Sequence, residues 1–167
     1  MSSFFVASLG RTRGEAGQEN MLDWSRLLAS GAAPAHAAWT IPEAFLAILI
    51  AAASCDGEVA AVEREEIVAI VHRSRALKSL SSAQLNQLQD RVTTRLNEAE
   101  GALGEACAAL PQDMRLSVFA HALDLVLADG ELTEAEADFL NTITRNFGLD
   151  GDAVRNVADV MIIKNQV

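Results

Sequence analysis

The chain has 167 residues, half of them apolar, which is enough for the core of one domain and too many for a disordered chain. Its 13 basic and 23 acidic residues leave a net charge of −10, and such an acidic surface repels the phosphates of nucleic acid. The longest wholly apolar run, residues 44–53, has ten residues, whereas a membrane span needs about 20, so we expect no membrane insertion.

Residues 1–39 are predicted to form a tail with an accessory helix near residues 21–30, because glycines interrupt the first part and no apolar periodicity is sustained there. The order of apolar and basic residues is not that of a signal peptide, and two cysteines, Cys55 and Cys107, are too few for a disulfide scaffold. We therefore expect a cytoplasmic protein with two buried thiols.

The main domain is expected over residues 40–167. Its first helix begins with Thr40, Pro42 and Glu43, which form the pattern of a capped first turn, and it stops near Gly57. Further helices are predicted from their 3.6-residue periodicity and caps. These span about 61–76, 82–96 and 98–110, and then begin at Pro111, Thr133 and Asp150. Since no segment alternates with period two, the sequence predicts an all-α bundle of six to eight helices.

One pattern occurs twice, at an offset of 73 residues. The Asp-Gly-Glu at 56–58 returns at 129–131, and on either side Leu46 falls on Phe119 and Ile67 on Leu140. Each copy therefore combines an apolar helix, an acidic turn and a helix with an acidic start. Two such hairpins around one core predict a pseudo-twofold repeat, with halves at about 40–100 and 113–167.

Negative charge is concentrated at the two turns. Residues 56–66 hold five acids and one arginine, a net charge of −4, and residues 129–138 hold five acids and no base, a net charge of −5. Carboxylates repel one another, so such clusters favour a bound cation or a basic partner.

Hard cations such as Ca²⁺ and Mg²⁺ prefer oxygen ligands, and Ca²⁺ takes six to eight of them. One turn supplies too few, but two turns brought together supply a plausible shell. The candidate ligands are Asp56, Glu58, Glu63, Asp129, Glu131 and Glu136. The sequence therefore predicts a divalent-cation site, with Ca²⁺ or Mg²⁺ as the expected ion.

Three other interpretations of the turns remain open. Thr133 and Glu136 have the spacing of a capping box, which explains Glu136 without metal, although Ala60 cannot play the part of Thr133 in the first copy. The acidic face could instead bind a basic protein without metal. An EF-hand loop is disfavoured, because its first and third positions would be Leu125 and Leu127.

Other chemistry finds little support. The three histidines, His36, His72 and His121, lack metal-ligand spacing, and His72 and His121 fall on predicted helices where a structural role is expected. Trp24 and Trp39 are expected to fix the N-terminal segment to the bundle. No nucleophile motif and no phosphate-binding loop occurs, so we do not expect an enzyme, with acid–base catalysis by the carboxylates as the remaining alternative.

The segments 51–58 with Glu63, and 127–131 with Glu136, resemble the TerB tellurite-resistance family over about residues 42–163. The same fold occurs in the N-terminal domain of some membrane-anchored J-domain co-chaperones, whose His-Pro-Asp motif this chain lacks. The resemblance implies a helical, non-enzymatic stress-response protein that binds metal through these acids.

The resemblance also implies protein partners from the Ter system or other stress proteins, and pairing with a second copy of the chain is compatible with it. The chain departs from the family pattern at Ala60 and Ala61, after the first turn, and in its first 39 residues.

Overall fold

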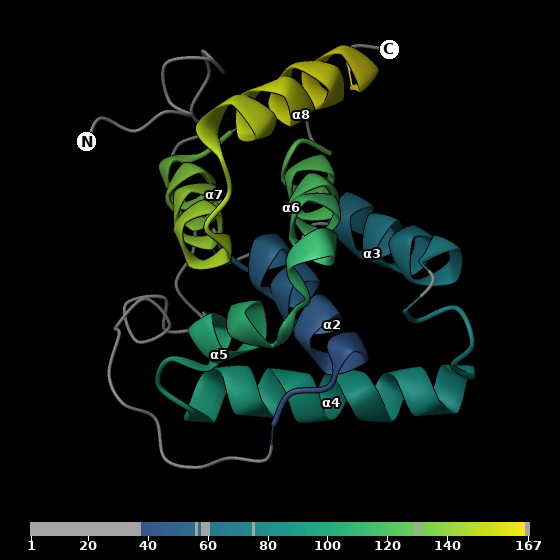
Figure 1. Ribbon diagram of the computed structural model, residues 1–167. Coiled ribbons are helices and arrows are strands. Elements are labelled where there is room, and N and C mark those ends of the chain that lie inside the picture. Colours follow the sequence, from purple (N-terminus) through teal and green to yellow (C-terminus); the bar gives the residue numbers. More distant parts are fainter. Residues whose placement is uncertain are drawn as a thin grey trace.

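The computed structural model describes residues 38–55, 57, 61–74, 76–128, 130 and 132–165, without the side chains of residues 61–66. Within these ranges the chain forms seven helices and no strand, as predicted for an all-α bundle (Figure 1). No helix in them is long and apolar enough to cross a membrane. The predicted tail and accessory helix lie outside the described residues.

The helices in chain order are α2 (Ile41–Ala53), α3 (Ala61–Arg73), α4 (Ser82–Glu98), α5 (Ala102–Ala109), α6 (Gln112–Val126), α7 (Glu134–Phe147) and α8 (Gly151–Lys164). Figure 1 shows α2 and α6 at the centre, α3 and α7 on opposite sides of them, and α4 and α8 at the two ends of the bundle. Helix α2 packs against α3, α4, α5 and α6, and α6 also packs against α3, α7 and α8.

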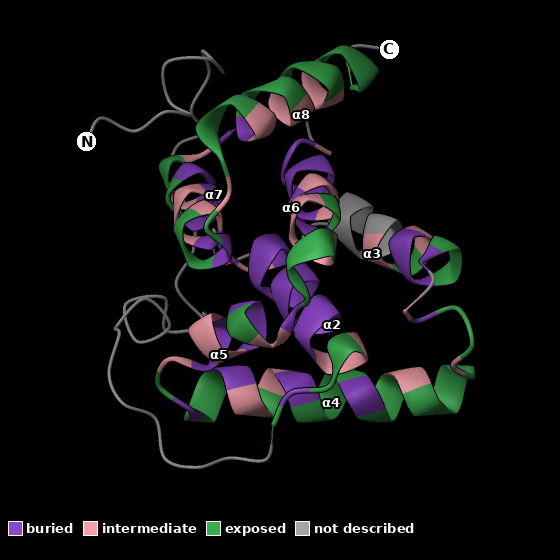
Figure 2. Ribbon diagram, viewed as in Figure 1, coloured by how far each residue is buried: buried purple, intermediate pink, exposed green. Residues whose placement is uncertain are grey.

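Helix α2 is the centre of the core. All ten residues from Ala44 to Ala53 are buried, so the helix is apolar on every side, as a central helix requires (Figure 2). Its first turn is fixed by the predicted capping box, in which the Thr40 N–H donates to Glu43 Oε2 over 3.0 Å. Partial burial disfavours the charge of Glu43, but hydrogen bonds from Thr40 and Arg91 outweigh this and lower the pKa of Glu43 below its usual value.

The 73-residue repeat is present in the helix boundaries. Helices α2 and α6 end at positions 53 and 126, and helices α3 and α7 begin at positions 61 and 134. In the turns between them, Gly57 and Gly130 have φ values of 94° and 79°. Each glycine N–H also donates a hydrogen bond of 3.1 Å to the carbonyl three residues earlier, Gly57 to Ser54 and Gly130 to Leu127. The two turns therefore share one backbone conformation at these glycines.

Two predicted helix boundaries are wrong. Helix α3 ends at Arg73 rather than near residue 76, because the Ser74 hydroxyl accepts the Leu77 N–H over 3.1 Å and starts a turn. Glu98 belongs to α4, and the next helix starts only at Ala102, because Gly101 at a φ of 79° separates α4 from α5.

Trp39 attaches the segment before α2 to the bundle, as predicted. Its indole is 8% exposed, and its Nε1 donates to Glu105 Oε2 over 3.3 Å. The Arg95 guanidinium lies 3.9 Å from the ring centroid and forms a 2.8 Å ion pair with Glu105. The start of α2 is thus tied to both α4 and α5. Trp24 lies outside the described residues.

Polar side chains on α6 hold three other helix ends. Asp124 accepts from Lys164 Nζ through both carboxylate oxygens, at 2.6 and 2.7 Å, which fixes the end of α8. Arg115 donates to the carbonyls of Leu110 and Phe147, at 3.0 and 3.1 Å. These two carbonyls at the ends of α5 and α7 would otherwise lack helical partners.

Gly104 and Gly148 each have room for an added Cβ, so substituting them with alanine tests backbone conformation without changing side-chain packing. We expect Gly104→Ala to stabilise the fold by about 0.5–1 kcal/mol, because Gly104 lies within α5 and nothing is within 4 Å of the added Cβ. Gly148→Ala should instead destabilise by about 1 kcal/mol, because Gly148 ends α7 at a φ of 62°. Urea unfolding measures both, and equal effects of the two substitutions would contradict the assignment.

Candidate functional site

Each acidic turn follows directly from the end of a central helix. At the end of α2, the Ser54 hydroxyl donates to the Ile50 carbonyl over 2.7 Å, and the Cys55 thiol donates to the Ala52 carbonyl over 3.0 Å. The second turn is held between two buried leucines, Leu127 at 7% and Leu132 at 4% exposure. Buried side chains thus lie on both sides of Gly130 in the sequence.

The six predicted metal ligands are only partly described. Four lie outside the described residues, namely Asp56, Glu58, Asp129 and Glu131. Glu63 lies in α3, but its side chain is among those not described, so Glu136 alone is placed in full. In the part of the chain that is placed, no three His, Cys, Asp or Glu side chains gather as a metal would require. The shared cation shell therefore stays a prediction.

Glu136 closes the first turn of α7. Its side chain is 3% exposed, and its Oε2 accepts the Thr133 N–H over 2.6 Å, while its own N–H donates to Thr133 Oγ1 over 3.2 Å. This is the capping box that the sequence offered as an alternative to metal binding. A carboxylate has about four acceptor positions, so the cap and an ion are compatible at one side chain.

The start of α7 suits negative charge without a ligand. Glu134 and Glu136 both lie in the first turn, where the helix dipole stabilises each carboxylate by about 0.3–1 kcal/mol. The dipole and the capping box together account for Glu134 and Glu136 but not for the acids in the turn before them.

The described histidines do not form a site. His72 is exposed in the last turn of α3, and the His121 ring lies 5.6 Å from that of Phe45, at an angle of 59° between the planes. This packing fits the structural role predicted for His121, whereas His36 lies outside the described residues.

Sequence reasoning missed an open pocket between α2, α3 and α6, with a volume of about 420 Å³. Its lining residues are Phe45, Arg73, Ser74, Ala76, Asp113, Met114, Ser117, Val118 and His121. The pocket uses the N-terminal part of α6 and the C-terminal end of α3, whereas the acidic turns follow the C-terminal ends of α2 and α6. The signal that could have revealed it was the spacing of Asp113, Ser117 and His121, three polar residues four positions apart on α6.

The architecture is that of a helical bundle in which two hairpins, each with a glycine-centred acidic turn, bury one core. Residues 42–159 match the family model described as tellurite resistance protein TerB, a range that contains both turns and most of α8. No curated protein and no solved structure matches the chain. The chain therefore belongs to the TerB family, and the resemblance noted in its sequence is confirmed.

We expect Thr133→Ala to destabilise the fold by about 1 kcal/mol, because it removes the hydroxyl that accepts the Glu136 N–H. Thr133→Ser keeps a hydroxyl and is the matched control, with an effect of a few tenths of a kcal/mol. Urea unfolding at pH 7 without metal measures both variants. If the serine variant lost as much stability as the alanine variant, the cap would not be the reason.

The two thiols should be unreactive in the folded chain. Both cysteines are buried thiols outside any disulfide, and desolvation raises the pKa of Cys107 to about 12 despite a hydrogen bond with Asn146. An aromatic disulfide reagent at pH 8 should therefore label neither thiol in the native protein and both in guanidinium. Rapid native labelling would show that the core opens at these positions.

Proposed function

We propose that this TerB family member is a non-enzymatic, cytoplasmic stress-response protein, acting in resistance to tellurite, that binds Ca²⁺ or Mg²⁺ through its two acidic turns. The supporting observation is that one glycine conformation and one acidic sequence pattern recur together at the same offset. Gly57 and Gly130 have matching φ signs and matching hydrogen bonds, and an Asp and a Glu flank each of them in the sequence.

The donor chemistry suits a hard cation. The proposed ligands are the carboxylates of Asp56, Glu58, Glu63, Asp129, Glu131 and Glu136. They offer oxygens alone, with neither the thiolates nor the imidazoles that Zn²⁺ prefers. A bound cation would offset part of the charge that these turns concentrate, because they supply net charges of −4 and −5.

The proposed partners are Ter-system or other stress proteins. A TerB family domain without a catalytic motif is expected to act by binding, and the acidic turns present the strongest charge in the sequence.

Titration calorimetry and thermal unfolding with Ca²⁺, Mg²⁺, Mn²⁺ and Zn²⁺ test the cation site. At a metal concentration 100 times the Kd, we expect stabilisation by about 2.7 kcal/mol. The double variant Glu63→Gln with Glu136→Gln should lose this stabilisation. A glutamine side chain still supports a capping box, so the loss reports the missing charge rather than a missing cap. No heat and no thermal shift at millimolar metal would overturn the proposal.

The matched control is Glu98→Gln with Glu100→Gln. It removes the same charge at two exposed positions outside the acidic turns. Its metal-dependent stabilisation should equal that of the unaltered chain, and an equal loss in both double variants would indicate a nonspecific charge effect.

A second candidate is a metal-free acidic surface that binds a basic protein. It is favoured by the capping box, which gives Glu136 a role without any ion. Salt-sensitive binding of a basic Ter-system partner in excess chelator, together with no metal response, would favour this second function over the first.

A further inference from the structure

Because of the repeat, each surface of one hairpin has an equivalent surface on the other. The two hairpins differ in that α5 covers a surface of only one of them. This short helix packs against α2 and α7, and four of its eight residues are buried: Ala102, Leu103, Ala106 and Cys107. Its Cys107 side chain is hydrogen-bonded to Asn146, near the end of α7. Under the repeat, α2 corresponds to α6 and α7 to α3, so the equivalent surface lies between α6 and α3.

That equivalent surface is where the open pocket lies. Asn146 and Phe147, beside α5, correspond to Arg73 and Ser74, which line the pocket. In the described part of the chain no helix takes the place of α5 there, and Figure 1 shows α5 on the α7 side of the centre only. The pocket is thus the counterpart, in the first hairpin, of the surface that α5 occupies in the second.

The exposed and covered copies of this surface have different chemistry. On α2, Ala44 and Ile48 are both 0% exposed, whereas their counterparts on α6 are Ser117, which is exposed, and His121, which is half-buried. Ser74, a small side chain that lines the pocket, lies at the position equivalent to Phe147. These polar residues allow the surface to be wet when nothing is bound.

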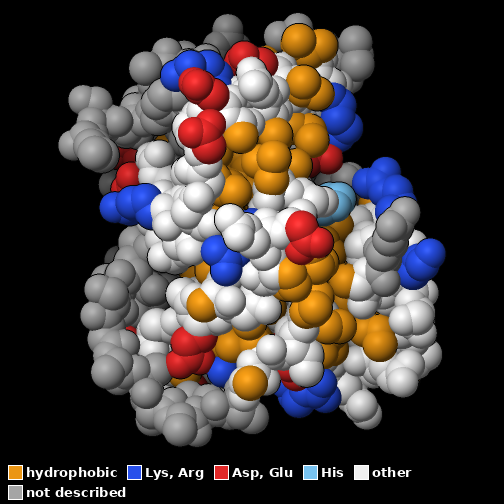
Figure 3. Space-filling model, viewed as in Figure 1, with side chains coloured by type: hydrophobic (Ala, Val, Ile, Leu, Met, Phe, Trp, Pro, Cys, Tyr) orange, Lys and Arg blue, Asp and Glu red, His pale blue; other side chains and the backbone are white. Residues whose placement is uncertain are grey.

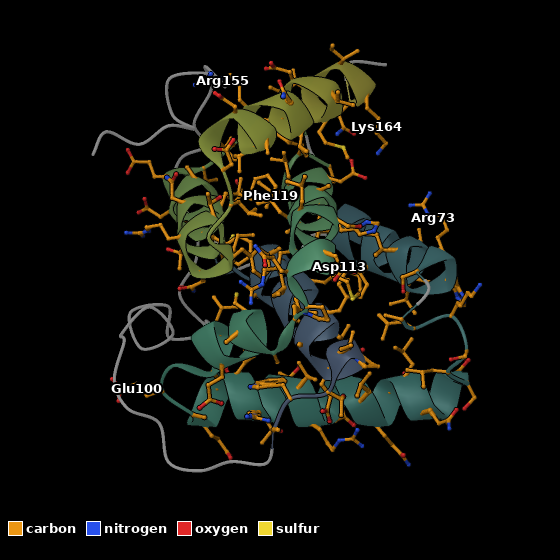
Figure 4. All side chains as sticks on the ribbon, viewed as in Figure 1. Arg73, Glu100, Asp113, Phe119, Arg155 and Lys164 are labelled. Carbon is orange, nitrogen blue, oxygen red and sulfur yellow. The ribbon has the colours of Figure 1, made fainter. Side chains whose placement is uncertain are left out.

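The floor of the pocket is nevertheless apolar. Phe45 and Val118 are 3% and 2% exposed at its base, and Figure 3 shows hydrophobic side chains gathered between α6 and α3. Arg73 and Asp113 lie on its two sides, on α3 and α6 (Figure 4). Five of the nine lining residues are polar or charged, so the hollow combines an apolar floor with polar edges, and its volume is about 420 Å³.

We propose that this pocket, the α3–α6 groove, docks a short helix of a partner protein, with small apolar residues on one face as in α5. Arg73 occupies the position equivalent to Asn146, which forms a hydrogen bond with Cys107 of α5. The partner residue that takes the place of Cys107 would therefore face Arg73, and an acidic residue suits that position. This is the helix-in-groove mode, in which residues spaced by three or four enter one apolar hollow. Polar residues at the edge favour a partner that binds reversibly.

The probe is a synthetic peptide of residues 100–111 of this chain with Gly104→Ala, to favour the helix, and Cys107→Glu, to face Arg73. It is titrated against the ¹⁵N-labelled full chain and followed by NMR. We expect saturable shifts at the amides of Ser74, Ala76, Ser117 and His121. No shift at millimolar peptide, or shifts confined to α2 and α7 through exchange with α5, would overturn the proposal.

A charge exchange tests the predicted pairing. Arg73→Glu, at an exposed position, should lower the affinity for the Cys107→Glu peptide about threefold or more, because it replaces an attraction by a repulsion. A peptide with Cys107→Lys should bind this variant better than the unaltered chain. If both peptides bound the unaltered chain and the Arg73→Glu variant with equal affinity, Arg73 would not contribute to binding and the prediction of an acidic partner residue would be wrong.

The groove could instead be covered by the N-terminal segment of the same chain. A nitroxide attached through Ser25→Cys tests this, since both native cysteines are buried. Broadening of the Ser117 and His121 amides by this label, with no response to the peptide, would assign the groove to the chain itself and overturn the proposal. Unbroadened amides that respond to the peptide would support it.

Discussion

The packing of α2 against α6 is the contact on which the rest of the molecule depends. Helix α2 is buried along ten consecutive residues and touches four other helices, and α6 carries the side chains that hold the ends of α5, α7 and α8. Both acidic turns begin within a few residues of these two helices, after Ala53 and Val126. The crossing of α2 and α6 therefore decides where the turns lie, and interiors packed at crystal-like density allow little freedom in that crossing.

Local signals in the sequence were enough to find most helix starts. Thr40, Ser81 and Thr133 each precede a Glu or Gln by three residues, and all three form capping boxes in the structure. Such a signal works because donor and acceptor lie within one turn, so tertiary contacts are not needed to bring them together. The repeat was visible for a similar reason, since it preserves the apolar spacing of each helix.

Helix ends and the site itself were harder to predict. Ser74 ends α3 by accepting a backbone N–H, which the periodicity of apolar residues does not reveal. Extended Ala99 ends α4, and Gly101 in the left-handed conformation precedes α5. For the site, sequence gives the identity of the carboxylates but not the distance between turns, which depends on how two hairpins cross. Of the predicted ligands, Glu136 alone is fully placed, and there it acts as a cap.

The capping role of Glu136 does not decide the function of its counterpart. In the second hairpin Thr133 and Glu136 satisfy each other's backbone groups, so an acid would be favoured at this position without any ion. In the first hairpin Ala60 lacks the hydroxyl, and the reciprocal bond of a capping box is impossible, yet the acid recurs as Glu63. A capping box therefore accounts for Glu136 more completely than for Glu63. Glu63, which lacks a capping partner, is therefore a stronger argument for a cation than Glu136.

The two surfaces proposed to bind ligands lie toward opposite ends of α6. The groove uses its N-terminal part, up to His121, and the second acidic turn follows Val126. A helix of 15 residues is about 22 Å long, so the groove at Asp113 lies well away from that turn. Substitutions at distant sites without shared partners usually have independent effects. A cation site and a helix-binding groove can therefore be tested separately, and the loss of one would leave the argument for the other intact.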